Sequence, residues 1–175
     1  MKTLCRNHDS TEKTVQKSKT MLLCRTAALT AIIFAVTRII QIPIPLGYLN
    51  IGNAVILFSC LLLPKTYGIF AGSIGSAIAD LTSFPAYTIP TLIIKALMPL
   101  VFYLVHGKNK EKKAFRIIAA AIATLIPLVG YTITGMLLYG SFYMGLSQLP
   151  GLLVEYAGNL VLFVVSERLL AIHRF

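Results

Sequence analysis

The sequence contains few residues of the kinds that usually perform chemistry. Three cysteines and three histidines occur among 175 residues, and none has the spacing of a metal site. No histidine is combined with a nucleophile and a carboxylate as a catalytic triad requires. Gly-rich phosphate loops and paired carboxylates are also absent. We therefore expect no enzyme activity, no metal site and no cofactor in this chain.

Charged residues are scarce as well, and the apolar residues gather in long blocks. Hydrophobic residues make up 57% of the chain and the mean hydropathy is +0.79, which is more apolar than a soluble domain. Each block is bounded by proline, glycine or charge. The blocks cover residues 21–40, 50–63, 66–81, 87–105, 115–139 and 149–172.

Four of these blocks, the first, fourth, fifth and sixth, are long enough to cross a membrane. A helix rises about 1.5 Å per residue, and the hydrocarbon core is roughly 30 Å thick. The second and third blocks are short, so each alone could be a re-entrant segment. Pro64 and Lys65 between them supply a turn with a cation, which favours two short helices. The sequence thus predicts an all-α integral membrane protein with six transmembrane helices.

The distribution of Lys and Arg predicts the orientation. Apart from Arg38 and Lys95, these residues occupy the amino-terminal arm, the loops after the second and fourth blocks, and the carboxyl end. The other three loops, 41–49, 82–86 and 140–148, contain no charged residue. By the positive-inside rule both termini are cytoplasmic. We expect a cytoplasmic arm over residues 1–20 and a six-helix membrane domain over residues 21–175. The net charge of +10 then reflects the orientation in the membrane, because the basic residues are spread over several loops. We therefore expect no nucleic-acid partner.

Four ionisable residues fall inside the predicted spans, where each is costly unless it faces a cavity or a partner. They are Arg38, Asp80, Lys95 and Glu155. One interpretation is structural neutralisation, for example an ion pair between Arg38 and Asp80 near the outer interface. The other is a binding site, in which Lys95 and Glu155 are the strongest candidates.

Two polar helix faces favour such a site. Lys95 shares a face with Thr91, and Glu155 shares one with Asn159, which together describe a pocket for a small polar ligand. Tyr131 could add a ring and a hydroxyl, or could simply be a packed aromatic residue. The neutral loop 43–50 would form a stiff flap above the pocket. The candidate substrate-binding residues are Arg38, Tyr48, Asn50, Asp80, Thr91, Lys95, Tyr131, Glu155 and Asn159.

Small residues form two stripes. Ala27, Ala31 and Ala35 recur every four residues on the first predicted helix, so another backbone can approach closely. The third predicted helix has a similar face, comprising Gly68, Ala71, Gly72, Gly75, Ser76 and Ala79. Each stripe has two interpretations, packing within the monomer or docking of another membrane protein.

Three runs carry a resemblance to a known family. They are Gly-Tyr-Leu-Asn-Ile-Gly-Asn-Ala at 47–54, Ala-Gly-Ser-Ile-Gly-Ser-Ala-Ile-Ala-Asp-Leu at 71–81, and Pro-Thr-Leu-Ile-Ile-Lys-Ala-Leu at 90–97. The chain resembles the membrane S components of energy-coupling factor (ECF) transporters over about residues 25 to 170. The likeness is strongest to the riboflavin-type group, which also holds carriers for vitamin B6. One departure is Asn53, where many relatives have Asp.

The resemblance implies a bacterial, multi-pass cell-membrane protein that captures a vitamin from outside. It also implies partners: a transmembrane coupling (T) subunit, docked on Ala27, Ala31 and Ala35, and two ATPase subunits that hydrolyse ATP. In such transporters the whole S component topples in the membrane to deliver its vitamin.

The family resemblance does not identify the vitamin, so we infer the substrate from the candidate pocket residues. Pyridoxine or a related hydroxymethylated heterocycle is favoured, because a Lys and a Glu could pair with a phenolate oxygen and a ring nitrogen. Riboflavin is the alternative. A membrane scaffold protein without transport, which predicts no saturable ligand binding, stays open. A self-contained secondary transporter is a further alternative, although the chain shows no inverted repeat.

Overall fold

The computed structural model describes residues 2–44, 47–107 and 113–172. Almost all of them are helical, and the remainder is dominated by one short hairpin. In chain order the elements are α1 (Lys2–Ile39), β1 (Ile42–Ile44), β2 (Gly47–Leu49), α2 (Gly52–Leu62), α3 (Lys65–Ser83), the 3-10 turn η1 (Pro85–Tyr87), α4 (Thr88–His106), α5 (Lys113–Tyr139), α6 (Phe142–Ser147) and α7 (Leu149–Ile172).

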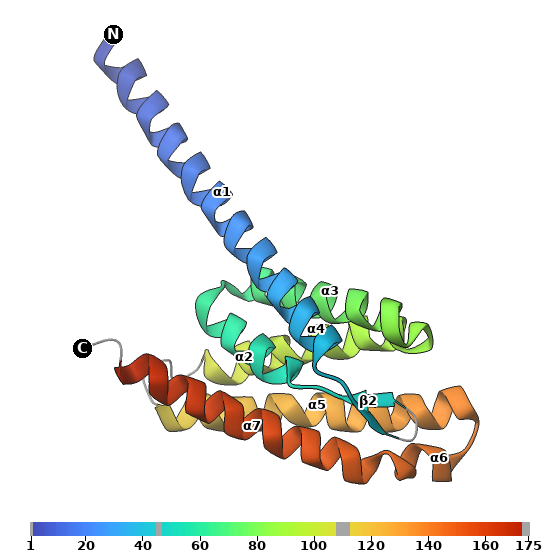
Figure 1. Cartoon of the computed structure of the whole chain (residues 1–175). Coiled ribbons are helices and arrows are strands. Elements are labelled where there is room, and N and C mark those ends of the chain that lie inside the picture. Colours follow the sequence, from blue (N-terminus) through green and yellow to red (C-terminus); the bar gives the residue numbers. More distant parts are fainter. Residues whose placement is uncertain (1, 45–46, 108–112, 173–175) are drawn as a thin grey trace.

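Every apolar block of the sequence forms a helix close to its expected bounds, with one large difference at the amino end. Helix α1 begins at Lys2 rather than at residue 21. Residues 1–41 contain neither proline nor glycine, so nothing in the sequence ends the helix before the membrane segment. Figure 1 shows the amino-terminal half of α1 extending away from the other helices.

Four segments of the described chain are long and apolar enough to cross a membrane. They are Ser18–Ile39, Pro85–His106, Lys113–Tyr139 and Phe142–Arg168. Helix α2 is apolar but has only 11 residues, and α3 is not among the four. Many large apolar side chains lie on the outside of the bundle, as expected of a surface that faces lipid. The protein is therefore a multi-pass membrane protein.

The helices pack side by side around α3, α4 and α5. Helix α3 contacts α1 and α4, α4 contacts α5, and α7 contacts both α5 and α2. Strands β1 and β2 pair antiparallel, with Ile42 opposite Leu49 and Ile44 opposite Gly47. The hairpin and α6 lie at one end of the bundle, and the carboxyl end of α7 lies at the other (Figure 1).

The two stripes of small residues have different surroundings. On α3 the small face is buried, and a Cβ added at Gly75 would lie 2.8 Å from the carbonyl oxygen of Thr30 on α1. That stripe is therefore internal packing. On α1 the side chains of Ala27 and Ala31 are exposed, and Ala35 is half-buried. Helix α1 contacts α3 through Thr30 and Ile33, so its alanine stripe points elsewhere.

The interior is divided into an apolar half and a polar half. The apolar core lies toward the end that carries the last turns of α7, where Phe102 of α4, Phe163 of α7 and Ala120 of α5 are buried together. Toward the hairpin the buried residues are instead polar, and they include Asp80, Lys95 and Glu155. This polar half contains the candidate site.

Candidate functional site

A pocket opens beneath the hairpin, between the ends of α3, α5 and α7. The space between its lining atoms is about 410 Å³, counted to its open mouth. The centres of water-sized spheres can occupy only about 40 Å³ of this space, so its enclosed part is narrow. The lining residues are Ile44, Tyr48, Asn50, Asp80, Phe84, Tyr87, Tyr131, Gln148, Leu152 and Glu155.

Asp80, near the end of α3, is held by hydroxyl groups. The Tyr48 hydroxyl donates to its Oδ1, and the Thr91 hydroxyl donates to its Oδ2. Thr91 in turn lies 3.0 Å from the hydroxyl of Tyr131, which continues the chain across to α5. Burial, with a further contribution from the Asp80 carboxylate, raises the pKa of Tyr48, so its hydroxyl stays protonated and able to donate. The hairpin is thus attached to α3 by a side-chain hydrogen bond.

Asn53 joins the buried Lys95 to Glu155. The Lys95 amine donates to Oδ1 of Asn53, and Nδ2 of Asn53 donates to Oε1 of Glu155 at 2.9 Å. Lys95 is 1% exposed and Asn53 2% exposed, so both are shielded from water. The two charged residues are therefore connected through a neutral amide. An aspartate at position 53 could accept from Lys95 but, when ionised, could not donate to Glu155.

Asn159 on α7 secures the start of α2. It accepts a hydrogen bond from the Ala54 amide at 2.8 Å, and its Nδ2 lies within 2.9 Å of two carbonyl oxygens, those of Asn50 and Glu155. No side chain at the N-cap, Ile51, satisfies the free amides of this helix end. Asn159 supplies that function from a distant part of the chain.

Two buried polar atoms in the pocket lack a hydrogen-bond partner within the described residues. They are the hydroxyl of Tyr87 and Nε2 of Gln148. Gln148 and Tyr139 both lie close enough to act on the Tyr87 hydroxyl, but neither contact has hydrogen-bond geometry. A Cβ at Gly135 would lie 2.0 Å from Nε2 of Gln148. The Gln148 amide therefore fits against α5 only because residue 135 is a glycine. Buried unpaired groups in a cavity are available to a ligand.

Aromatic rings form one wall of the site. Tyr48, Phe84, Tyr87 and Tyr131 follow one another with ring centroids 6.1, 6.4 and 6.2 Å apart. These distances are within the range of favourable ring contacts. The Lys95 amine lies 5.4 Å from the centroid of Tyr131, which places a cation behind the wall. The site can therefore offer a flat apolar surface together with donors and carboxylate acceptors.

The structure brings most of the predicted residues together, in two layers. Tyr48, Asn50, Asp80, Tyr131 and Glu155 line the pocket. A second set, Thr91, Lys95 and Asn159, is buried behind them and bonded to the lining residues or their backbone.

Arg38 differs from the other candidates. Its side chain is exposed, although its charge acts on Tyr48 and offsets a small part of the rise that burial causes in the pKa of that hydroxyl. Among the described residues between 18 and 168, no ion pair links Arg38 to Asp80.

Several pocket residues were not among the predicted ones. Phe84 and Tyr87 lie in the short connection before α4, and Gln148 is the residue between α6 and α7. A neutral aromatic residue or amide in a loop gives no signal that it faces a cavity. The hairpin does agree with the expected flap over loop 43–50, since Ile44 and Tyr48 line the pocket. Residues 45–46 of that loop lie outside the described residues.

Comparisons with known proteins agree with this architecture. Residues 17–167 match the family described as the ECF-type riboflavin transporter, S component. A solved S component of a bacterial ECF transporter superposes with a TM-score of 0.71 at 21% identity, covering 87% of this chain and 96% of that one. A Pyrococcus woesei protein, described as an uncharacterised protein in the gap 3′ region, is 30% identical over 106 residues, or 59% of this chain and 71% of that protein.

Proposed function

The chain belongs to the family of S components of ECF-type riboflavin transporters, and from this premise we propose that it captures a small heterocyclic vitamin in the pocket beneath the hairpin. The observation that carries this proposal is the pocket itself, where two carboxylates and two unpaired buried polar atoms face one cavity. An interior built only for stability would pair these groups with one another.

Pyridoxine or a similar hydroxymethylated heterocycle is the substrate that we favour. Glu155 and Asp80 can accept hydrogen bonds from its hydroxyls or protonated ring nitrogen, and Gln148 and Tyr87 can donate to its oxygens. The pocket is narrow, and a single ring requires less rearrangement of its lining than a fused ring system does. Lys95, Thr91 and Asn159 act from behind the pocket by holding Glu155, Asp80 and the start of α2.

Riboflavin is the second candidate. The description of the family names it, and the wall of four aromatic rings offers a surface on which a fused ring system could stack. A fused three-ring ligand needs more room than a single ring, so in this narrow pocket it requires a larger outward movement of the hairpin.

Isothermal titration of the purified full chain with pyridoxine and with riboflavin separates these candidates. Glu155→Gln and Gln148→Leu should each weaken binding of the true substrate by about tenfold or more, because each removes one hydrogen bond to it. Ser147→Ala, at the exposed position next to Gln148, is the matched control and should bind like the parent. Absence of saturable binding for both vitamins would favour the scaffold alternative. Unchanged affinity in both site variants would remove this pocket from the function.

The proposal includes a membrane orientation. Six spans, with α2 and α3 as the short pair, would place the arm of residues 1–20, the carboxyl end and Lys65 in the cytoplasm of a bacterial cell, and residues 21–175 would form the membrane domain. In a background without native cysteines, Ser141→Cys should react with an impermeant thiol reagent in intact cells, whereas Lys65→Cys should not. The reverse pattern would overturn the orientation. Asn109, in the same predicted loop as Lys108, lies outside the described residues.

Transport itself is assigned to partner subunits. We propose that a transmembrane coupling subunit docks on Ala27, Ala31 and Ala35, and that two ATPase subunits supply the energy. The exposure of Ala27 and Ala31 supports this assignment, because α1 does not use them to contact α3. Small side chains let two helix backbones approach closely in a membrane.

A further inference from the structure

A groove on the outside of the bundle, between α5 and α7, has no part in the vitamin pocket. It encloses about 600 Å³, counted to its open side. Its lining is apolar except at one end, and it consists of Ile117, Leu160, Val161, Val164, Val165 and Arg168. The two helices that form it both include segments long enough to cross a membrane, so the groove faces lipid.

Helical spacing places positive charge at one end of this groove. On α7 the residues Val161, Val165 and Arg168 follow at intervals of four and three, which puts them on one face. On α5 an exposed residue, Lys113, lies one turn before Ile117 and on the same face. An apolar channel thus runs along the two helices and ends at cations.

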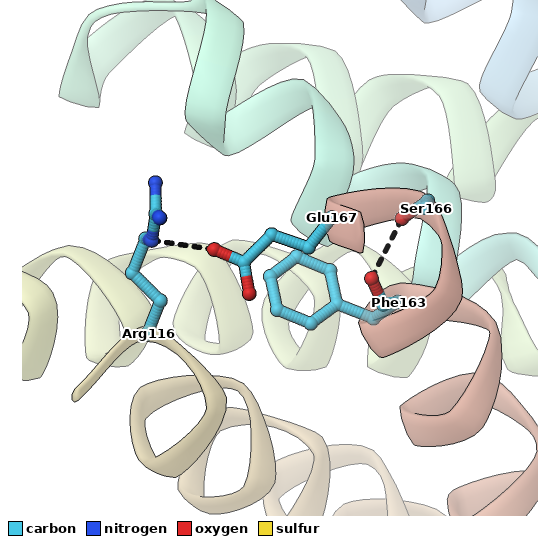
Figure 2. A network of polar contacts seen from close by, with 4 residues as sticks. All are labelled: Arg116, Phe163, Ser166 and Glu167. Carbon is cyan, nitrogen blue, oxygen red and sulfur yellow. Dashed lines mark hydrogen bonds and ion pairs between the residues drawn. The ribbon is translucent and has the colours of Figure 1, made fainter. Parts of the chain in front are cut away.

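Glu167, which precedes Arg168 in the sequence, already has an ion-pair partner. Glu167 is paired with Arg116 of α5, with Oε1 and Nε 2.5 Å apart. Figure 2 shows the two side chains meeting between the helices, close to the ring of Phe163. Within residues 18–168 of the described chain, Arg168 has no recorded ion-pair partner, and its side chain is exposed. Its charge is therefore available at the end of the groove.

A second groove, on the other side of α7, provides a comparison within the same molecule. It encloses about 610 Å³ and is lined by Ile51, Ala54, Val55, Phe58, Leu162 and Ser166. This lining contains no cation. An apolar groove in a membrane accepts any acyl chain, so only the α5/α7 groove has a basis for choosing a headgroup.

We propose that the α5/α7 groove is a binding site for an anionic phospholipid. One acyl chain lies along Val161, Val164 and Leu160, and the lipid phosphate contacts the Arg168 guanidinium. A zwitterionic lipid offers the same chain, but its headgroup carries a positive charge that weakens the attraction. The guanidinium is a suitable partner because its planar donors match phosphate oxygens. Basic positions beside membrane helices attract anionic lipids in this way.

Native mass spectrometry of the full chain can measure the proposed preference. The protein would be titrated with phosphatidylglycerol and phosphatidylcholine of identical acyl chains, and the adducts compared. We expect about fivefold more phosphatidylglycerol adduct, and Arg168→Gln should lower this ratio clearly, with Lys113 accounting for any preference that is left. Arg25→Gln removes another exposed arginine, on α1 and away from the groove, and should retain the preference.

Two further arms test the position and the nature of the ligand. Val165→Phe should displace the lipid by filling the α5/α7 groove, whereas Val55→Phe, in the second groove, should leave the preference intact. Glycerol phosphate without acyl chains should not compete at the lipid concentration used. Vitamin titration of each variant checks folding, since none of these residues lines the vitamin pocket.

Three results would overturn the proposal: equal adducts of the two lipids on the parent protein, an unchanged preference in both Arg168→Gln and Val165→Phe, or full competition by glycerol phosphate. None of them bears on vitamin capture, because that function is measured separately.

Discussion

The two clusters of charged residues, at opposite ends of the bundle, neutralise their charges in different ways. Between α5 and α7, Arg116 and Glu167 form a direct pair with one cation and one anion. In the pocket, Lys95 reaches Glu155 only through Asn53, and the charge of Asp80 is met by hydroxyls. The pocket cluster therefore contains two carboxylates and one amine, and neutral side chains bond to each of them.

The difference indicates what each cluster is for. A direct pair in an apolar setting leaves no charge for another molecule, so its contribution is to the packing of α5 against α7. The pocket cluster is oriented by neutral groups and leaves acceptors facing a cavity, beside the unpaired atoms of Tyr87 and Gln148. Orientation without full neutralisation is what recognition of a polar ligand requires.

The largest effect should follow from Lys95→Met. This change removes the one cation of the pocket cluster and leaves Asn53 and two carboxylates without it, at a cost of about 2–5 kcal/mol. Titration should show vitamin binding weakened by about tenfold to several thousandfold, and thermal unfolding in detergent should show a lower Tm. Lys65→Met, at an exposed position, is the control.

The double variant Lys95→Met with Glu155→Gln sharpens that result. If the two residues were only a structural pair, removing both charges would restore stability and binding together. We expect partial recovery of Tm without recovery of affinity. Parent-like affinity in the Lys95 variant would refute its role behind the pocket.

The second effect concerns the pair between α5 and α7. Arg116→Met or Glu167→Leu alone should lower stability by about 2 kcal/mol, between the values for exposed and buried pairs, because the side chains are 23% and 8% exposed. The double change should recover most of this loss. Vitamin affinity should stay constant throughout, measured by the same titration. A fall in affinity in the double variant would show that the two clusters are coupled.

A smaller effect should follow from Asn53→Asp. The carboxylate keeps the acceptor for Lys95 but loses the donor to Glu155, and it adds a third anion to the cluster. We expect binding about tenfold weaker, from one lost hydrogen bond and added repulsion. The same vitamin titration of Asn53→Ala, which removes both hydrogen bonds, gives the affinity loss with which the aspartate variant is compared. Tighter binding in the aspartate variant would mean that the amide does not orient Glu155 for the ligand.

The smallest effect on the isolated subunit should come from Ala31→Leu. The added bulk lies on an exposed face of α1, so ligand affinity should change by no more than about twofold. Co-purification with the coupling subunit and vitamin uptake by cells should nevertheless be lost, because backbones can no longer approach. Ala114→Leu adds the same bulk at an exposed position on α5 and is the control. Equal loss of ligand binding and assembly would place the stripe in the packing of the monomer.

Much of the fold follows from one-dimensional patterns, because membrane helices must be apolar over their whole length. The helix predicted over 149–172 is the observed α7, and the other predicted segments differ mainly at their ends. Helix α6 and the hairpin were not predicted. The two strands of the hairpin have three residues each, which is too few for a periodic signal, and Pro43 interrupts the first of them.

The candidate site was predictable where a charge lies in an apolar block, as for Asp80, Lys95 and Glu155. The contacts among them were not, because Asn53 bonds to residues 42 and 102 positions away. The resemblance to the family singled out Asn53, because many relatives have Asp there, but it gave no partner for this residue. Gln148 was missed because its burial depends on Gly135 of another helix.

The clamp that Asn159 provides has a consequence for biosynthesis. The amide of Ala54 at the start of α2 bonds to a side chain that is 105 residues further along the chain. At typical translation rates of about 5–20 residues per second, that partner is synthesised roughly 5–20 s later. Until α7 has been synthesised and has entered the membrane, the beginning of α2 lacks this cap and the pocket lacks Glu155. The vitamin pocket is thus completed late in translation, and a nascent chain interrupted before residue 155 has no complete pocket in which to hold a ligand.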